Sequence, residues 1–239
     1  GTDYRGGLPF RLDEGIGSRA RIGLVVLATD QTIEHEWRLV FSRLPGVALY
    51  ESRLWNEVRI TPETLAAMDG EIAAATRLIM PVLPLSVVAF GCTSAAMVLG
   101  EERIAARVHE ARPGVPVTTP IGGALAALRA LGARRIAVLT PYGRAVNDVV
   151  QRYLEDRGLE VPVFGSFEEE DDSKVARIDP ASIEAAVLER VGVKAAQVPV
   201  AVISGSSPKY RSSSLMSRIL RSGPSSKSTK RTRTLSGTA

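Results

Sequence analysis

The residue best suited to chemistry in this sequence is Cys92, the only cysteine among 239 residues, in the segment Gly91-Cys92-Thr93-Ser94. It follows an apolar run typical of a buried strand and precedes a segment with helical periodicity, so we expect it at the start of a helix. Unpaired amides and the helix dipole at such a position lower the pKa of a thiol and favour the reactive thiolate. The alternative interpretation is a small buried hydrophobe, which free cysteines often are.

Three other polar clusters also follow expected strands: Thr29-Asp30-Gln31, Thr118-Thr119 and Thr140-Pro141-Tyr142. Ligands of open parallel sheets bind at the carboxyl ends of the strands. The four clusters together therefore favour a ligand site at Cys92 over a purely structural role. The amides and hydroxyls of Thr93 and Ser94 are suited to hold a carboxylate.

Alternating apolar strands and amphipathic helices position these clusters. Strands are expected over 21–28, 47–50, 85–91 and 115–118, and helices over 31–44, 61–78 and 94–111. The pattern then repeats, with strands over 135–140, 161–164 and 198–204 and helices over 143–157 and 180–190. This order predicts an α/β fold of two pseudo-symmetric, Rossmann-like halves, each with a parallel sheet.

The repeat places Gly205 at the position equivalent to Cys92. Cys92 follows Arg21 by 71 residues, and Gly205 follows Arg135, the start of the equivalent strand, by 70 residues. The second half therefore has no thiol where the first half has one. We expect an N-terminal extension at 1–20, a first half at 21–119, a second half at 120–205 and a tail at 206–239.

The tail differs from the body in charge. It holds eight basic residues and no acidic one, whereas residues 1–205 hold 22 basic and 26 acidic residues. Serine accounts for 11 of its 34 residues, a composition too poor in apolar surface to fold. We expect a disordered or non-native tail, such as a translation in a shifted frame, which leaves the second half without its last helix and strand.

Composition argues against several classes of protein. One cysteine allows no internal disulfide, and two histidines form no zinc-type cluster with it, so we expect no metal. The longest apolar run, 78–90, contains two prolines and is too short to span a membrane. The first residues show no signal peptide, so a cytoplasmic location is expected.

A protein that binds nucleic acid or an acidic partner through the basic tail is the alternative from another class. Against it, the tail has one aromatic side chain for stacking, Tyr210, and the body is mildly acidic. Nucleic acid is therefore not the expected partner. The sequence leaves the oligomeric state open, a homo-oligomer included.

Four motifs carry a family resemblance: Thr29-Asp30-Gln31-Thr32-Ile33-Glu34, Gly91-Cys92-Thr93-Ser94, Val117-Thr118-Thr119-Pro120 and Leu139-Thr140-Pro141-Tyr142. As a set, over about 20–205, they resemble the maleate cis-trans isomerase and arylmalonate decarboxylase branch of the Asp/Glu racemase superfamily. The Thr-Asp-Gln-Thr motif is most similar to the ectoine-utilisation proteins of that branch.

The resemblance implies an active site between the two halves that uses no cofactor, with one cysteine from each half facing the substrate. Cys92 matches the first-half cysteine, and Tyr142 matches a tyrosine whose hydroxyl reaches the substrate. The expected substrate-binding positions are Asp30, Thr93, Ser94, Thr118 and Gly205.

Two positions depart from the family pattern. Asp30 stands where the isomerases carry asparagine, and an ionised aspartate repels a carboxylate but favours an ammonium group. The substrate is therefore expected to be an amino-acid derivative rather than a plain dicarboxylate. Gly205 stands at or next to the second cysteine, and loss of one acid or base commonly costs about 10²–10⁴-fold in rate, so impaired turnover is expected.

The expected function is a cofactor-independent racemase or cis-trans isomerase that acts on a small carboxylic or amino acid derivative through the Cys92 thiolate. A single-cysteine decarboxylase of the arylmalonate type is an alternative, although such enzymes carry their cysteine in the second half and glycine in the first. The acidic run at 168–172 is expected to be a solvated loop, and the family implies a substrate-proximal role as the alternative.

Overall fold

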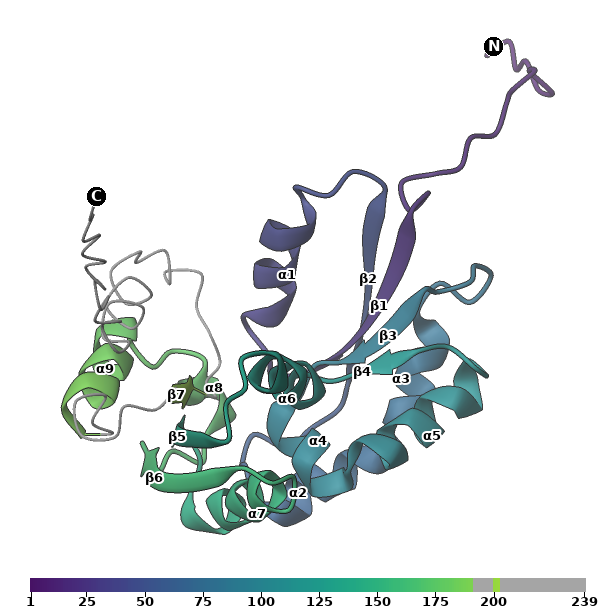
Figure 1. Ribbon diagram of the computed structural model, residues 1–239. Helices are drawn as coiled ribbons and strands as arrows, with labels where there is room; N and C mark the ends of the chain where they lie inside the picture. Colours follow the sequence, from purple (N-terminus) through teal and green to yellow (C-terminus); the bar gives the residue numbers. More distant parts are fainter. Residues whose placement is uncertain (191–199, 203–239) are drawn as a thin grey trace, which may run out of the picture.

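The computed structural model describes residues 1–190 and 200–202 and arranges them around two parallel sheets (Figure 1). The first sheet has the strand order β2-β1-β3-β4. Its strands are β1 (Ala20–Leu27), β2 (Val47–Leu54), β3 (Val87–Phe90) and β4 (Val117–Thr118). β1 lies in the centre, paired with β2 and β3, which explains why its sequence is a continuous apolar run.

The second sheet repeats the arrangement of the first three strands. β5 (Arg135–Thr140) lies between β6 (Glu160–Ser166) and β7 (Val200–Val202), and all three are parallel. The order β6-β5-β7 is equivalent to β2-β1-β3, so the predicted α/β fold with two similar parallel-sheet halves is confirmed. Gly205, the predicted loss of the last helix and strand, and the tail at 206–239 lie outside the described residues.

The described helices are, in chain order, α1 (Ile33–Phe41), α2 (Pro62–Ala67), α3 (Ile72–Leu78), α4 (Thr93–Leu99), α5 (Glu101–Ala111), α6 (Pro120–Ala130), α7 (Arg144–Glu155), α8 (Asp172–Val175) and α9 (Pro180–Ala185). A 3-10 turn, η1 (Met68–Gly70), precedes α3, and a π-helical turn, η2 (Ala186–Arg190), follows α9. Two of the expected helices are divided. The helix expected over 61–78 is interrupted by η1, and the helix expected over 94–111 is divided at Gly100, whose φ of +85° is a conformation that glycine adopts readily.

The helices cover both faces of the first sheet. Val25 and Leu27 of β1 belong to the core that includes α3 and α5, whereas Leu24 and Val26 pack towards α1 on the other face. Consecutive side chains of a strand point to opposite faces, and all four of these are buried. Figure 1 shows α1 beside β2, apart from α3 and α5.

α4 connects the two halves at the centre of the molecule. It contacts α2, α5 and α6 and also α7 of the second half. Ser94, Ala95 and Ala96 are buried in it, and such small side chains let neighbouring helices approach closely. One continuous core runs from Phe90 of the first sheet to Val138 of the second, so the start of α4 lies at the junction of the halves.

Residues 1–15 form neither helix nor strand and extend away from the rest of the chain (Figure 1). Among the helices of residues 1–190, none has the length and apolar character that a membrane span requires.

Candidate active site

The carboxyl ends of strands from both halves border a cavity of about 740 Å³. Every sequence-predicted site residue within 1–190 lines it: Asp30 after β1, Cys92, Thr93 and Ser94 after β3, Thr118 at the end of β4 and Tyr142 after β5. Gly205 lies outside the described residues. Side chains that are distant in sequence thus meet at the edge of the sheets where ligands of parallel sheets bind.

Cys92 is the N-cap residue of α4, as its sequence position predicts. Its Sγ accepts a hydrogen bond from the Ala95 amide at 3.4 Å and lies 3.5 Å from the Ser94 hydroxyl. The side chain is 6% exposed and lines the cavity. The thiol is therefore both packed in the core and directed at the space that a ligand would occupy.

The predicted lowering of the Cys92 pKa is wrong. Burial raises the pKa of the thiol to about 11, while the hydrogen bonds from Ser94 and the Ala95 amide oppose this rise and the carboxylates of Asp172 and Asp30 add to it. The free-energy cost of removing a thiolate from water is larger than the stabilisation that the amides of one helical turn provide. The resting thiol consequently holds its proton at neutral pH.

Tyr142 brings a phenol of the second half to the same cavity. It is 8% exposed, and burial raises its pKa, with a further rise from Cys92 and a partial offset from a hydrogen bond with Ser94. The backbone carbonyl of Tyr142 accepts hydrogen bonds from Asn147 Nδ2 at 2.6 Å and from Ser166 Oγ at 2.5 Å. The phenol is therefore fixed at the end of β5 and available as a neutral proton donor.

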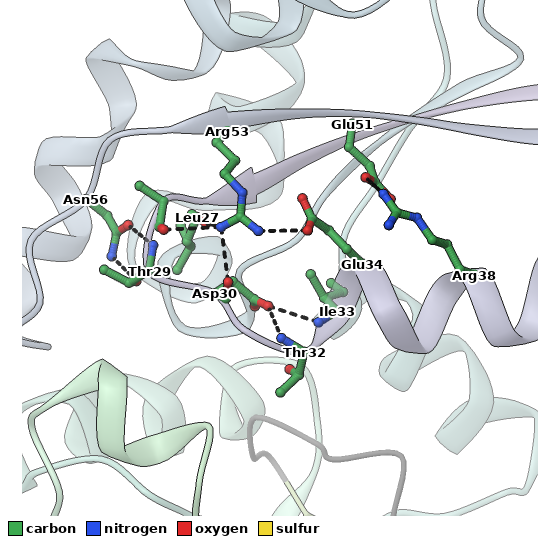
Figure 2. Close-up of polar contacts among 11 residues, drawn as sticks. Leu27, Thr29, Asp30, Thr32, Ile33, Glu34, Arg38, Glu51, Arg53 and Asn56 are labelled. Carbon is green, nitrogen blue, oxygen red and sulfur yellow. Dashed lines mark hydrogen bonds and ion pairs between the residues drawn. The ribbon is translucent and has the colours of Figure 1, made fainter.

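The loop after β1 is organised around the Asp30 carboxylate. Asp30 Oδ1 accepts hydrogen bonds from the amides of Thr32 at 2.8 Å and Ile33 at 2.9 Å, at the start of α1. Figure 2 shows this carboxylate pointing towards the two amides. Such bonds satisfy two of the amides that the first turn of a helix leaves unpaired.

Arg53 of β2 fixes the same loop from the other side (Figure 2). Its Nη1 donates to the carbonyls of Leu27 at 2.9 Å, Ala28 at 3.1 Å and Asp30 at 3.0 Å, and its Nη2 pairs with Glu34 at 2.7 Å. The planar guanidinium presents several donors in a fixed arrangement. One side chain thereby holds the carboxyl end of β1 and the start of α1 together.

Asp172 is a site residue that the sequence interpretation missed. It lines the cavity, and its Oδ2 accepts a short hydrogen bond from the Thr29 hydroxyl, which in turn accepts a hydrogen bond from Asn56 Nδ2 at 2.8 Å. Burial raises the pKa of Asp172, and the charge of Asp30 adds to the rise. The interpretation of the acidic run as a solvated loop is therefore wrong for this residue, although its position shortly after a strand was a signal for it.

Backbone hydrogen bonds hold the acidic loop of the second half against the first half. The Ile60 amide donates to the Glu170 carbonyl at 2.7 Å, and the Asp172 amide donates to the Val58 carbonyl at 2.9 Å. These bonds flank an antiparallel bridge between Arg59 and Asp171. The position of Asp172 is therefore determined by contacts between segments that are more than a hundred residues apart.

The two threonines at the carboxyl end of β4 have different roles. Thr118 is exposed on the cavity side, whereas Thr119 is buried and caps α6, accepting from the Gly122 amide at 3.0 Å and donating to Glu101 Oε1 at 2.6 Å. Within residues 1–190 and 200–202, no group of three or more histidine, cysteine, aspartate or glutamate side chains is placed to hold a metal ion. The described site thus offers a thiol, a phenol, hydroxyls and carboxyl groups for acid-base chemistry.

Comparison with known proteins places this geometry in a family. A family model described as arylmalonate decarboxylase matches residues 59–209. The maleate isomerase of Nocardia farcinica is 31% identical over 174 residues, which cover 70% of this chain and 69% of that protein.

Solved structures give the same result. A Cys-to-Ser variant of the Nocardia farcinica maleate cis-trans isomerase, with a covalently bound succinylcysteine intermediate, is 30% identical with a TM-score of 0.63, covering 70% of this chain and 71% of that one. A maleate isomerase from Pseudomonas putida, solved with maleate, is 26% identical with a TM-score of 0.63, covering 71% of this chain and 72% of that one.

The family prediction from the four motifs is confirmed by these matches, while the finer resemblance to ectoine-utilisation proteins stays a prediction. The family model spans more than half of the chain, and the Nocardia relative combines over 30% identity with coverage of more than two thirds of its length. With its thiol after β3 and its phenol after β5, the chain belongs to the maleate isomerase and arylmalonate decarboxylase branch of the Asp/Glu racemase superfamily and is an enzyme of the isomerase class.

Proposed function

We propose that this enzyme is a cofactor-independent racemase or cis-trans isomerase that acts on a small carboxylic acid or amino-acid derivative through Cys92. The observation that carries the proposal is the shared cavity, in which a buried thiol from the first half and a buried phenol from the second half line the same space. The succinylcysteine intermediate and the bound maleate of the two relatives support a cysteine-based reaction on a small carboxylate.

In the proposed proton transfer, the Cys92 thiolate removes the proton from the carbon next to the substrate carboxylate. The electron pair of the broken C–H bond moves onto that carboxylate, which becomes an enediolate. The Ser94 hydroxyl and the Ala95 amide stabilise the thiolate before the transfer. Tyr142 keeps its proton because its pKa is raised, so it donates a hydrogen bond to the developing oxyanion.

The position of Gly205 determines which outcome we expect. The sequence repeat places glycine where a second thiol would protonate the opposite face of the carbon. With Cys92 alone, the proton returns to the face that it left, which exchanges hydrogen with solvent but keeps the configuration. Inversion is then slower than exchange by about 10²–10⁴-fold, the usual contribution of one positioned acid.

Decarboxylation is a second candidate function, favoured by the raised pKa of Cys92. In that reaction a carboxylate leaves as carbon dioxide, the electron pair of the broken C–C bond forms an enediolate, and the protonated thiol delivers its proton to the carbon. Water then restores the thiol. A thiol that is protonated at neutral pH is already in the form that this step needs.

The test is NMR in deuterated water with a panel of maleate, 2-substituted malonates and small amino acids. We expect hydrogen exchange, isomerisation or loss of carbon dioxide for at least one compound. Cys92→Ser lowers that rate by at least about 10²-fold, and Tyr142→Phe lowers it by about 10²–10³-fold. Tyr50→Phe is the matched control, because Tyr50 lies on β2 and does not line the cavity.

Gly205→Cys tests the role assigned to the missing thiol. If the repeat is correct, this variant raises inversion towards the rate of exchange. An unchanged rate in Cys92→Ser, or no reaction across the whole panel, contradicts the proposed function.

A further inference from the structure

The described lining of the cavity is acidic. Its ionisable carboxyl groups belong to Asp30, Glu36, Glu57 and Asp172. The one basic side chain of that lining within 1–190 is Arg59, which is largely exposed and pairs with Glu170 at 3.0 Å, outside the lining. Cys92 and Tyr142 are neutral in the resting site because their pKa values are raised. A substrate that carries only negative charge is therefore poorly matched to this space.

Asp30 and Asp172 are linked through Thr29, and the charge of Asp30 contributes to the raised pKa of Asp172. The Thr29 hydroxyl donates to Asp172 Oδ2, and Asp30 is the next residue in the chain. The backbone of this loop is fixed by Arg53, as Figure 2 shows. The two carboxylates thus come from opposite halves of the protein and are both kept rigid.

Each of these carboxylates keeps one oxygen for a ligand. Asp30 Oδ1 is occupied by the amides of Thr32 and Ile33, and Asp172 Oδ2 is occupied by Thr29. Within residues 1–190, no hydrogen bond reaches Asp30 Oδ2 or Asp172 Oδ1. Both residues line the cavity, and two such acceptors match an ammonium group, which has three donors and no acceptor.

We infer that the substrate carries an ammonium group close to its reacting carbon, and that Asp30 and Asp172 hold this group beside Cys92. The inference rests on the proposed function for the identity of the reacting site. It selects amino acids and their derivatives over the plain dicarboxylate that the maleate-bound relative accommodates.

The same arrangement couples substrate binding to the state of the thiol. Both carboxylates contribute to the raised pKa of Cys92, and Asp30 contributes to the raised pKa of Asp172. A cation between them counteracts these effects, because an adjacent positive charge favours the ionised form of a thiol and of a carboxyl group. The amino group of the substrate would therefore assist in forming the thiolate that reacts with it.

The test compares ligands that differ only in the amino group. Succinate is paired with aspartate, and butyrate is paired with 2-aminobutyrate, with both enantiomers of each amino acid, in ligand-observed NMR titrations of the full chain. The amino member of each pair is expected to bind about 10- to 100-fold more tightly, as typical for a hydrogen bond to a charged group. Equal binding, or tighter binding of succinate or maleate, overturns the inference.

Two charge-neutral variants test the assigned residues. Asp30→Asn and Asp172→Asn are each expected to reduce the preference for the amino ligand by about tenfold or more, since the amide keeps the shape but loses the charge. Glu168→Gln is the matched control, because it removes one charge from an exposed residue of the same loop that does not line the cavity. If Asp172→Asn does not fold, Asp30→Asn and the comparison of ligand pairs on the unaltered protein still test whether the site prefers an amino ligand.

Cys92→Ser separates this inference from the proposed function. The variant should bind amino ligands with the same preference while losing the reaction. A preference without any reaction in the unaltered protein contradicts only the proposed function, whereas a reaction on dicarboxylates without any preference contradicts only the inference.

Discussion

At the scale of single residues, burial and the helix terminus act in opposite directions on Cys92. The Ala95 amide and the Ser94 hydroxyl favour the thiolate, but the thiol is 6% exposed and faces two carboxylates. Burial is the larger effect, so the resting site contains a thiol and a phenol that both hold protons. A reaction that begins with proton donation can start from this state. A reaction that begins with proton removal requires the substrate to promote ionisation of the thiol first.

The reactivity of Cys92 towards iodoacetamide should follow its raised pKa. Because only the thiolate reacts, the rate should increase about tenfold for each pH unit and level off near pH 11 rather than near 8.5. The measurement is the alkylation rate by mass spectrometry between pH 6 and 11.

The chain denatured in guanidinium chloride provides the reference for an unperturbed thiol, and Cys92→Ser gives the background. A plateau below pH 9 in the folded protein would show that burial does not control this thiol.

At the scale of elements, the loop between β1 and α1 depends on one arginine. Arg53 binds three carbonyls of this loop and Glu34 of α1, whereas Arg38 of α1 pairs with Glu51 of β2 and contacts no carbonyl of the loop (Figure 2). The two arginines form comparable ion pairs between the same helix and strand. Their difference therefore isolates the contribution of the carbonyl contacts.

Arg53→Ala should lower the free energy of unfolding by about 1 kcal/mol and weaken ligand binding, because it releases the backbone that carries Asp30. Arg38→Ala should also cost about 1 kcal/mol, because the Glu51 side chain, which is 13% exposed, loses its partner, but ligand binding should be unchanged. Urea denaturation and ligand titration measure both effects. Arg53→Lys should recover only part of the loss, since the three donors of one ammonium group cannot replace the three carbonyl contacts and the Glu34 pair together. Equal losses of ligand binding in the two alanine variants would contradict this role.

The sequence predicted the order of strands and helices better than their boundaries: the strand expected over 47–50, for example, continues to Leu54. β5 lies at the predicted residues because its continuous apolar run, which follows Arg135 and ends before Thr140-Pro141, is typical of a buried strand. The break at Gly100 was not predicted because the apolar periodicity continues across it. The positive φ of Gly100 is a property of the backbone and does not change the pattern of apolar side chains. The cavity-lining positions of Cys92 and Tyr142 could be predicted because strand ends converge in parallel sheets.

Asp172 shows what local sequence cannot reveal. In the sequence it is one of five consecutive acidic residues, and such a run is usually solvated. Its burial results from hydrogen bonds to Thr29, 143 residues away, and to Val58. The sequence places Asp172 shortly after a strand, but the long-range pairing that buries it leaves no pattern in a single sequence.

At the scale of the whole molecule, the two halves are joined by hydrogen bonds and by a common hydrophobic core. The hydrogen bonds of Ile60 and Asp172 join loops of different halves, the core is continuous across the junction, and Glu101 accepts hydrogen bonds from Thr119 and from Tyr153 of α7. Separation of the sheets as rigid bodies would break these contacts together. We therefore expect the site to be formed before a ligand binds.

Hydrogen exchange of backbone amides checks this expectation. The amides of Ile60 and Asp172 should exchange slowly, within about tenfold of amides in β5, since they open only when the halves separate. The Arg59 amide, which donates no hydrogen bond within residues 1–190, should exchange fast and serves as the local control. Fast exchange at all three positions would show that the halves part readily in solution.

The single sulfhydryl lines the cavity, so covalent modification of this group reports which molecules enter the cavity. Any electrophilic fragment that becomes attached to the native chain through sulfur must have entered that space to do so. Intact-mass screening of a fragment library would therefore map which shapes and charges are admitted, before any turnover has been observed.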